Sequence, residues 1–72
     1  MTNNAIVTAA VLFVNTLLDY NDKATPAEIG ECANSKFANS TNGPIIAVMA
    51  TLYACALARG VNPARAEYDL RA

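Results

Sequence analysis

Two long stretches without a charged residue restrict the fold of this chain more than any other feature. They run from Thr2 to Leu18 and from Phe37 to Ala58 and make up over half of the 72 residues. A chain of this size buries only about 60% of the surface that it exposes when unfolded. Two helices this apolar therefore need more core than one copy can form. We expect the surplus apolar surface to contact another chain.

The composition fits a single folded domain over residues 1–72. The apolar fraction is 54%, above the typical range of about 45–50%, so disorder over the whole chain is not expected. Five basic and six acidic residues give a net charge of −1, and no run of one sign exceeds a pair. Without a basic patch, nucleic acid is not expected as the main partner.

The residue pattern predicts a compact all-α bundle of three to four short helices, assembled as a homodimer. Alternating strand patterns are absent, because the β-branched residues stand singly among Ala and Leu. We expect the helices at about 4–20, from Pro26 onward, at 44–59, and from Pro63 to the C-terminus. The short helix from Pro26 begins with a capping box, Thr25-Pro26-Ala27-Glu28, in which Thr25 is the N-cap residue. Its buried stripe is expected to contain Ile29, Cys32, Ala33 and Phe37.

A seam of small residues marks the third expected helix. Spacings of 3, 4 and 4 put its members on one side of that helix, which lets another helix approach closely. The seam is suited either to the interior of one chain or to self-association. The predicted self-association residues are Ala47, Ala50, Ala54 and Ala58.

The residues that carry most catalytic chemistry are absent. The chain has no histidine, which excludes Ser-His-Asp and Cys-His catalysis and most zinc sites. Its two cysteines are too far apart for a Cys-x-x-Cys motif, and its three glycines are scattered rather than gathered in a phosphate loop. We therefore expect no enzyme activity, no cofactor and no metal.

The function expected from these features is stoichiometric binding of another protein. A regulator or inhibitor in the cytoplasm fits, such as a phage-encoded protein for host takeover or anti-defence. Binding energy at such surfaces concentrates in aromatic and arginine side chains. The predicted partner-binding residues are Tyr20, Phe37, Arg65, Tyr68 and Arg71.

Two alternative functions stay open at this point. Residues 25–31 are typical of the opening of a helix-turn-helix, whose next helix needs basic or amide side chains to read DNA bases. Lys36 is the lone candidate before the polar loop, so DNA binding is the weaker hypothesis. The apolar runs also suggest a membrane-associated hairpin, although each is shorter than the roughly 20 apolar residues that span a bilayer.

Overall fold

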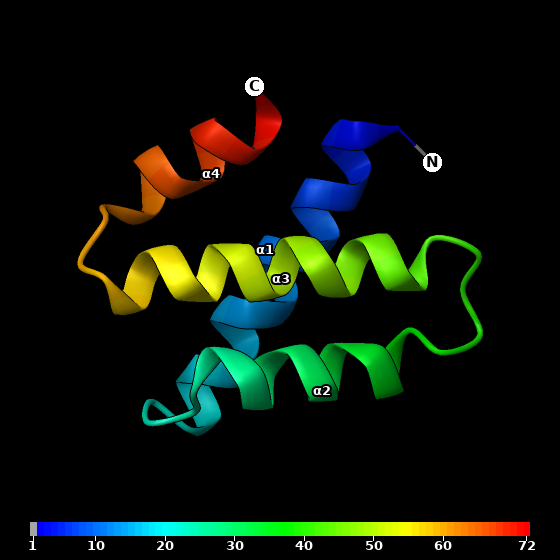
Figure 1. Cartoon of the computed structure of the whole chain (residues 1–72), viewed down its shortest axis with the longest axis horizontal. Helices are drawn as coiled ribbons and strands as arrows, with labels where there is room; N and C mark the ends of the chain where they lie inside the picture. The colour runs from blue at the N-terminus through cyan, green and yellow to red at the C-terminus, as the bar shows by residue number, and fades with distance from the viewer. Residues whose placement is uncertain (1) are drawn as a thin grey trace.

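The chain folds into four α-helices, which confirms the predicted all-α bundle, while the homodimer stays a prediction. The computed structural model describes residues 2–72, and within that range it contains no strand. The helices are α1 (Asn3–Tyr20), α2 (Pro26–Lys36), α3 (Gly43–Ala58) and α4 (Pro63–Arg71) (Figure 1). The Cα radius of gyration is 11.0 Å, close to the value of about 11 Å for a compact chain of this length.

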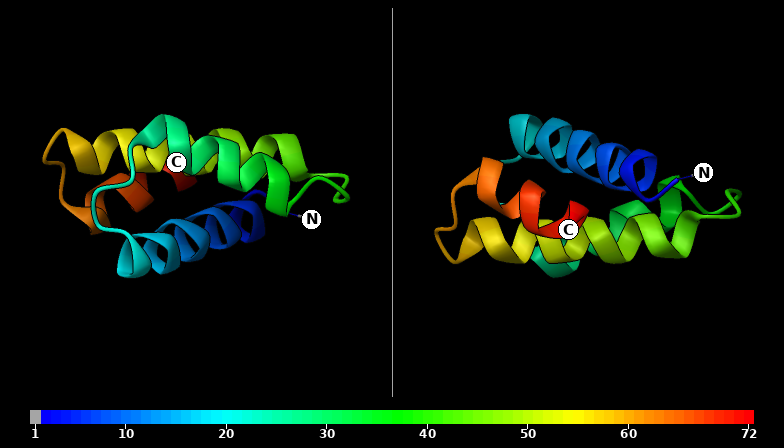
Figure 2. Two further views of the ribbon diagram at one scale, coloured as in Figure 1. Left: turned by 90° about the horizontal axis from the view of Figure 1, so that it is seen from below. Right: turned by 90° about the horizontal axis from the view of Figure 1, so that it is seen from above.

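The helices pack in two levels. α2 and α3 run antiparallel and side by side, and α1 crosses them at a steep angle (Figure 1). The views in Figure 2 place α1 on one side of the α2–α3 pair, while α4 lies between α1 and α3. Within residues 2–72, no further helix lies on the opposite side of the α2–α3 pair.

Side-chain caps set the starts of three helices. The Thr25 hydroxyl accepts a hydrogen bond from the Glu28 amide at 3.2 Å, and the Glu28 carboxylate accepts one from the Thr25 amide at 2.8 Å. This reciprocal pair confirms the predicted capping box. Thr2 caps α1 and Asn62 caps α4 in the same manner, each through its side-chain oxygen.

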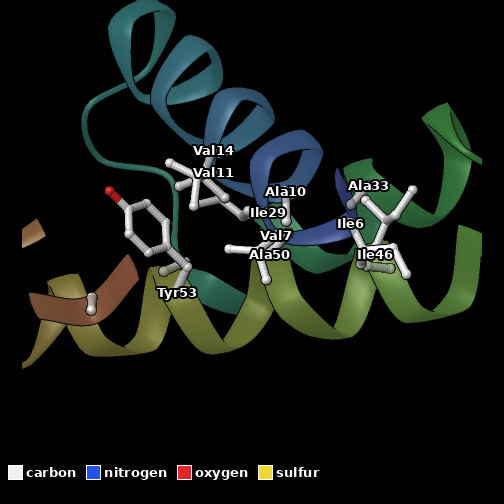
Figure 3. Close-up of a cluster of buried hydrophobic side chains, with 13 residues drawn as sticks. Ile6, Val7, Ala10, Val11, Val14, Ile29, Ala33, Ile46, Ala50 and Tyr53 are labelled. Carbon is white, nitrogen blue, oxygen red and sulfur yellow. The ribbon is translucent and has the colours of Figure 1, made fainter. Parts of the chain in front are cut away.

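One hydrophobic core joins all four helices. Tyr53 is the largest fully buried side chain, and Val7, Val14, Ile29 and Ile46 surround the same interior (Figure 3). From α4, Ala66 is buried in the core and Leu70 packs against it half-buried. No buried side-chain nitrogen or oxygen lacks a hydrogen-bond partner in the part of the chain that the structure describes. The core is therefore apolar, and its few polar side-chain atoms have hydrogen-bond partners.

The alanine seam of α3 is an internal packing surface. Ala47, Ala50 and Ala54 are 4%, 0% and 4% exposed within a single copy, and they belong to the core. Their small side chains let neighbouring helices approach α3 closely. The same chain therefore already covers three of the four alanines that were predicted for self-association. Ala58, the fourth member, is exposed at the end of α3.

The predicted buried stripe of α2 also needs one correction. Ile29 and Ala33 are buried and Phe37 is half-buried, but Cys32 is exposed. Gly30 is buried in its place. A Cβ atom at Gly30 would lie 2.5 Å from Oγ1 of Thr51, so α2 and α3 pack closely at a position where α2 has no side chain. Both cysteines are free thiols.

Candidate functional site

An open apolar groove lies between α1 and the C-terminal end of α2. Its volume is about 460 Å³. The groove follows three turns of α1 and ends at the last residues of α2, and we call it the α1–α2 groove. Its lining residues are Ala9, Leu12, Phe13, Thr16, Leu17, Tyr20, Lys36 and Phe37.

The groove exists because the apolar arc of α1 is wider than the core needs. Phe13 and Leu17 are half-buried against the core, whereas Leu12 is 66% exposed and Tyr20 is 88% exposed. The ring of Phe37, the residue directly after α2, meets the ring of Phe13 edge to face, with centroids 5.8 Å apart. The two phenylalanines thus form the inner wall, and Leu12 and Tyr20 stand at the solvent side.

Lys36 is the only charged residue among those that line the groove. Its ammonium nitrogen lies 5.8 Å from the centroid of the Phe37 ring, which suits a weak cation–π contact at an exposed site. The ion pairs between described residues are Arg65–Asp69 and Arg71–Glu67, so no carboxylate of residues 2–72 pairs with Lys36. The groove therefore combines apolar walls with one uncompensated positive charge.

The five predicted partner-binding residues separate into three groups. Tyr20 and Phe37 line the groove together. Arg65 and Tyr68 lie elsewhere, on the exposed side of α4, where the guanidinium of Arg65 contacts both the Tyr68 ring and the Asp69 carboxylate. Arg71 is engaged within the chain. The sequence therefore identified two residues of the groove and one separate exposed pair.

Arg71 fastens the end of α4 to the beginning of α1. Its Nη1 donates a hydrogen bond to the Asn4 carbonyl oxygen at 3.0 Å, and its Nη2 donates to the Thr8 hydroxyl at 3.0 Å. The carboxylate of Glu67 accepts a further bond from Nη2 at 2.8 Å. With its donors used in this way, Arg71 has a structural role, and the structure does not support it as a partner-binding residue.

Sequence reasoning missed Leu12, Phe13, Leu17 and Lys36 as groove residues. One signal was present, because Leu12 interrupts the polar stripe of α1 formed by Asn4, Thr8, Asn15 and Asp19. A single exposed apolar residue is ordinary, so Leu12 becomes informative only because it adjoins Phe13 and Leu17 in the same groove. The contribution of Lys36 had no such signal, since it depends on where α2 crosses α1.

The structure offers little for the two alternative functions. In a helix-turn-helix, α3 would be the recognition helix, yet it exposes Ile45, Val48 and Leu52 and contains no basic residue. Among residues 2–72, no helix has the length and apolar character needed to cross a membrane. The same residues contain no group of three or more His, Cys, Asp or Glu side chains placed to hold a metal ion.

Comparisons with protein-family models, with curated proteins and with solved structures found no match to this chain.

Proposed function

We propose that this chain acts by stoichiometric binding of another protein, and that the α1–α2 groove receives an amphipathic helix of that partner. The observation that carries the proposal is the groove itself: exposed Leu12 and Tyr20 above a wall of half-buried aromatic rings. Monomeric proteins seldom expose such contiguous apolar surface without using it for binding.

The dimensions of the groove suit a helix as the occupant. Its α1 side runs from Ala9 to Tyr20, a length of about 16 Å at 1.5 Å per helical residue. Three turns of a partner helix cover this distance and present anchors at positions i, i+4 and i+7. Tyrosine is a frequent centre of binding energy, and Tyr20 is placed to cover the bound helix.

The charge of the groove defines the chemistry of the partner. Lys36 has no carboxylate partner among residues 2–72 and lies beside the apolar wall. A partner helix with an acidic residue next to its apolar face would neutralise this charge, whereas a basic helix would be repelled. We therefore infer an acidic amphipathic helix as the ligand. A chain that covers such a helix would regulate or inhibit its owner, as a small cytoplasmic or phage-encoded inhibitor does.

The test compares two variants whose altered residues are equally exposed. Leu12 and Tyr68 are both 66% exposed, one in the groove and the other on α4. Titration calorimetry would use a synthetic amphipathic helix with leucine anchors and one glutamate. We expect Leu12→Glu to weaken binding at least tenfold, which is about 1.4 kcal/mol, and Tyr68→Glu to leave the affinity unchanged.

A charge exchange tests the role of Lys36. The Lys36→Glu variant should prefer a peptide in which lysine replaces the glutamate, and the wild-type chain should prefer the original peptide. Equal affinity of the wild-type chain for both peptides would contradict the inferred chemistry of the partner. Loss of binding on Tyr68→Glu, with Leu12→Glu unaffected, would move the site from the groove to α4.

A further inference from the structure

A second exposed apolar surface lies on α3, on the side that faces away from the core. Ile45, Val48 and Leu52 are 47%, 56% and 51% exposed. Their spacings of 3 and 4 align them along one side of the helix, and we call this stripe the α3 ridge. The ridge is opposite the buried alanine seam, so α3 is apolar on both sides and only one of them is covered by its own chain.

A shallow hollow lies directly beside the α3 ridge. It has a volume of about 340 Å³ and occupies the junction between α2 and α3. Val48 and Leu52 belong to both features, and the remaining lining residues are Asn34, Pro44, Ala47 and Thr51. Helices pack by placing the ridge of one into the groove of another. A surface with a ridge next to a hollow is therefore complementary to a copy of itself turned by a two-fold rotation.

The distribution of charge favours a second copy as the occupant of this surface. Across a two-fold axis each surface meets itself, so a charge near the axis would oppose a like charge. α3 contains no acidic or basic residue, and none lines the hollow. The α1–α2 groove, by contrast, contains Lys36 and would oppose two lysines in the same arrangement. Neutrality thus assigns the α3 surface to self-association and the groove to a different partner.

The position of the α3 ridge leaves it open to a second copy. The Cα atoms span 31 × 26 × 16 Å, and the α2–α3 pair lies on the broad side of this flat molecule (Figures 1 and 2). A standard protein interface buries about 800 Å² on each partner, so a stable dimer has to bury more of this broad side than the α3 ridge alone. α1 covers the other side of the α2–α3 pair, so this side is the one open to a second copy.

We propose that two copies of the chain form a two-fold symmetric dimer in which their α3 helices pack antiparallel, the α3 ridge of each copy entering the hollow of the other. The dimer leaves both α1–α2 grooves open, because these lie chiefly along α1. The proposal does not depend on the proposed function. It replaces the buried alanine seam with the α3 ridge as the self-association surface.

Sedimentation equilibrium of the full chain tests the dimer. The mass of one copy is 7.6 kDa, so we expect twice this mass for the wild-type chain at high concentration. Val48→Glu and Leu52→Lys should each return the mass to that of one copy, because both put like charges across the two-fold axis. Leu12→Glu, the groove variant, should remain dimeric. Circular dichroism of each variant establishes that its helices are retained.

Two results would overturn the dimer. The first is a single-copy mass for the wild-type chain over the whole concentration range, a result that needs no variant to fold. The second is a dimer that persists in folded Val48→Glu and Leu52→Lys. Because Leu12→Glu reports on the groove and Val48→Glu on the ridge, failure of one proposal is distinguishable from failure of the other.

Discussion

At the scale of single residues, Gly30 and Thr51 determine how closely α2 and α3 pack. The Thr51 hydroxyl donates a hydrogen bond to the Ala47 carbonyl oxygen at 2.8 Å, which holds its Oγ1 in the position that a Cβ at residue 30 would need. A glycine in the middle of a helix costs about 1 kcal/mol of helix propensity relative to alanine. The close helix contact offsets that cost.

This contact predicts that substitutions at residues 30 and 51 are not additive. Gly30→Ala should destabilise the wild-type chain, since overpacking costs about 1–3 kcal/mol and exceeds the gain in helix propensity. In a Thr51→Ala background the obstructing oxygen is gone, and the same substitution should stabilise by up to about 1 kcal/mol. A double-mutant cycle measured by urea unfolding would give the coupling energy; additive effects would contradict the contact.

Tyr53 is buried, and its hydroxyl donates a long hydrogen bond of 3.5 Å to Oδ1 of the exposed Asn15 at the edge of the core. Burial raises the pKa of Tyr53 above its ordinary value of 10.0, and the carboxylate of Glu67 acts in the same direction by opposing the phenolate charge. The neutral phenol is therefore the form that the folded state favours.

This raised pKa predicts a loss of stability at alkaline pH. The neutral phenol of Tyr53 adds to the free energy of unfolding, and this addition is fully present below pH 10.0, the pKa of tyrosine in the unfolded state. The addition is lost as the pH rises toward the higher pKa of the folded state. Unfolding free energies measured across this range should fall faster for the wild-type chain than for Tyr53→Phe, by at most about 1.4 kcal/mol per pH unit. Tyr20→Phe, at an exposed position, should keep the wild-type slope. Equal slopes for all three proteins would exclude this role of Tyr53.

At the scale of the helix, α2 depends on its cap. α2 has 11 residues with a low mean apolar character, and an isolated helix of that length is marginal in water. The Thr25–Glu28 pair satisfies two amides that would otherwise lack partners. The hydrogen bond from the Thr25 amide lowers the pKa of Glu28 below its ordinary value of 4.5, because the bond favours the carboxylate.

The cap predicts a stability difference that changes with pH. Thr25→Ala should lower the free energy of unfolding by about 1 kcal/mol. Glu28→Gln should be less stable than the wild-type chain at neutral pH. Because the pKa of Glu28 is lower in the folded state, its carboxylate stabilises the fold above pH 4.5, the unfolded-state pKa. This stabilisation is lost as the pH falls through the folded-state pKa. The difference between Glu28→Gln and wild type should therefore shrink in acid; a constant difference would contradict the role of the carboxylate.

At the scale of the whole molecule, the two ends of the chain are held together by Arg71. Its contact with Asn4 spans 67 positions of the sequence, and its contact with Thr8 spans 63. Both contacts hold α4 against α1. α4 contributes a single buried residue, Ala66, to the core. The docking of α4 therefore relies on this polar contact more than the docking of the other helices does.

Removal of the Arg71 side chain should loosen α4 before the rest of the fold. We expect Arg71→Ala to lower the unfolding free energy by about 1 kcal/mol, since the side chain is partly exposed, and to reduce hydrogen-exchange protection mainly in α4. Arg65→Ala is the matched control, because its i,i+4 ion pair with Asp69 makes no contact with α1. It should change stability by less than about 0.5 kcal/mol. Uniform loss of protection over all four helices would contradict a local role.

The chain does not expose an unusual total area, but its exposed apolar side chains lie close together in two places. The chain exposes 4572 Å², near the roughly 4,300 Å² that a folded monomer of this mass exposes. Its exposed large apolar side chains are instead concentrated in the α1–α2 groove and on the α3 ridge. Two separate surfaces, one with a charge and one without, suit two different partners.

The sequence alone determined the class of fold and the positions of its helices. Local rules are sufficient for this, because capping by Thr25 and Asn62, the prolines at the first helical positions and the terminating Gly60, whose φ is 85°, all act within a few residues.

Only the tertiary structure decided which side of each apolar helix is covered. α3 is apolar around most of its circumference, so its sequence does not distinguish Ala50, which the core buries, from Val48, which solvent reaches. That choice depends on the crossing of α1, α2 and α3, which brings together residues distant in sequence. The α1–α2 groove arises from the same crossing, because Phe13 and Phe37 meet only where α1 passes the end of α2.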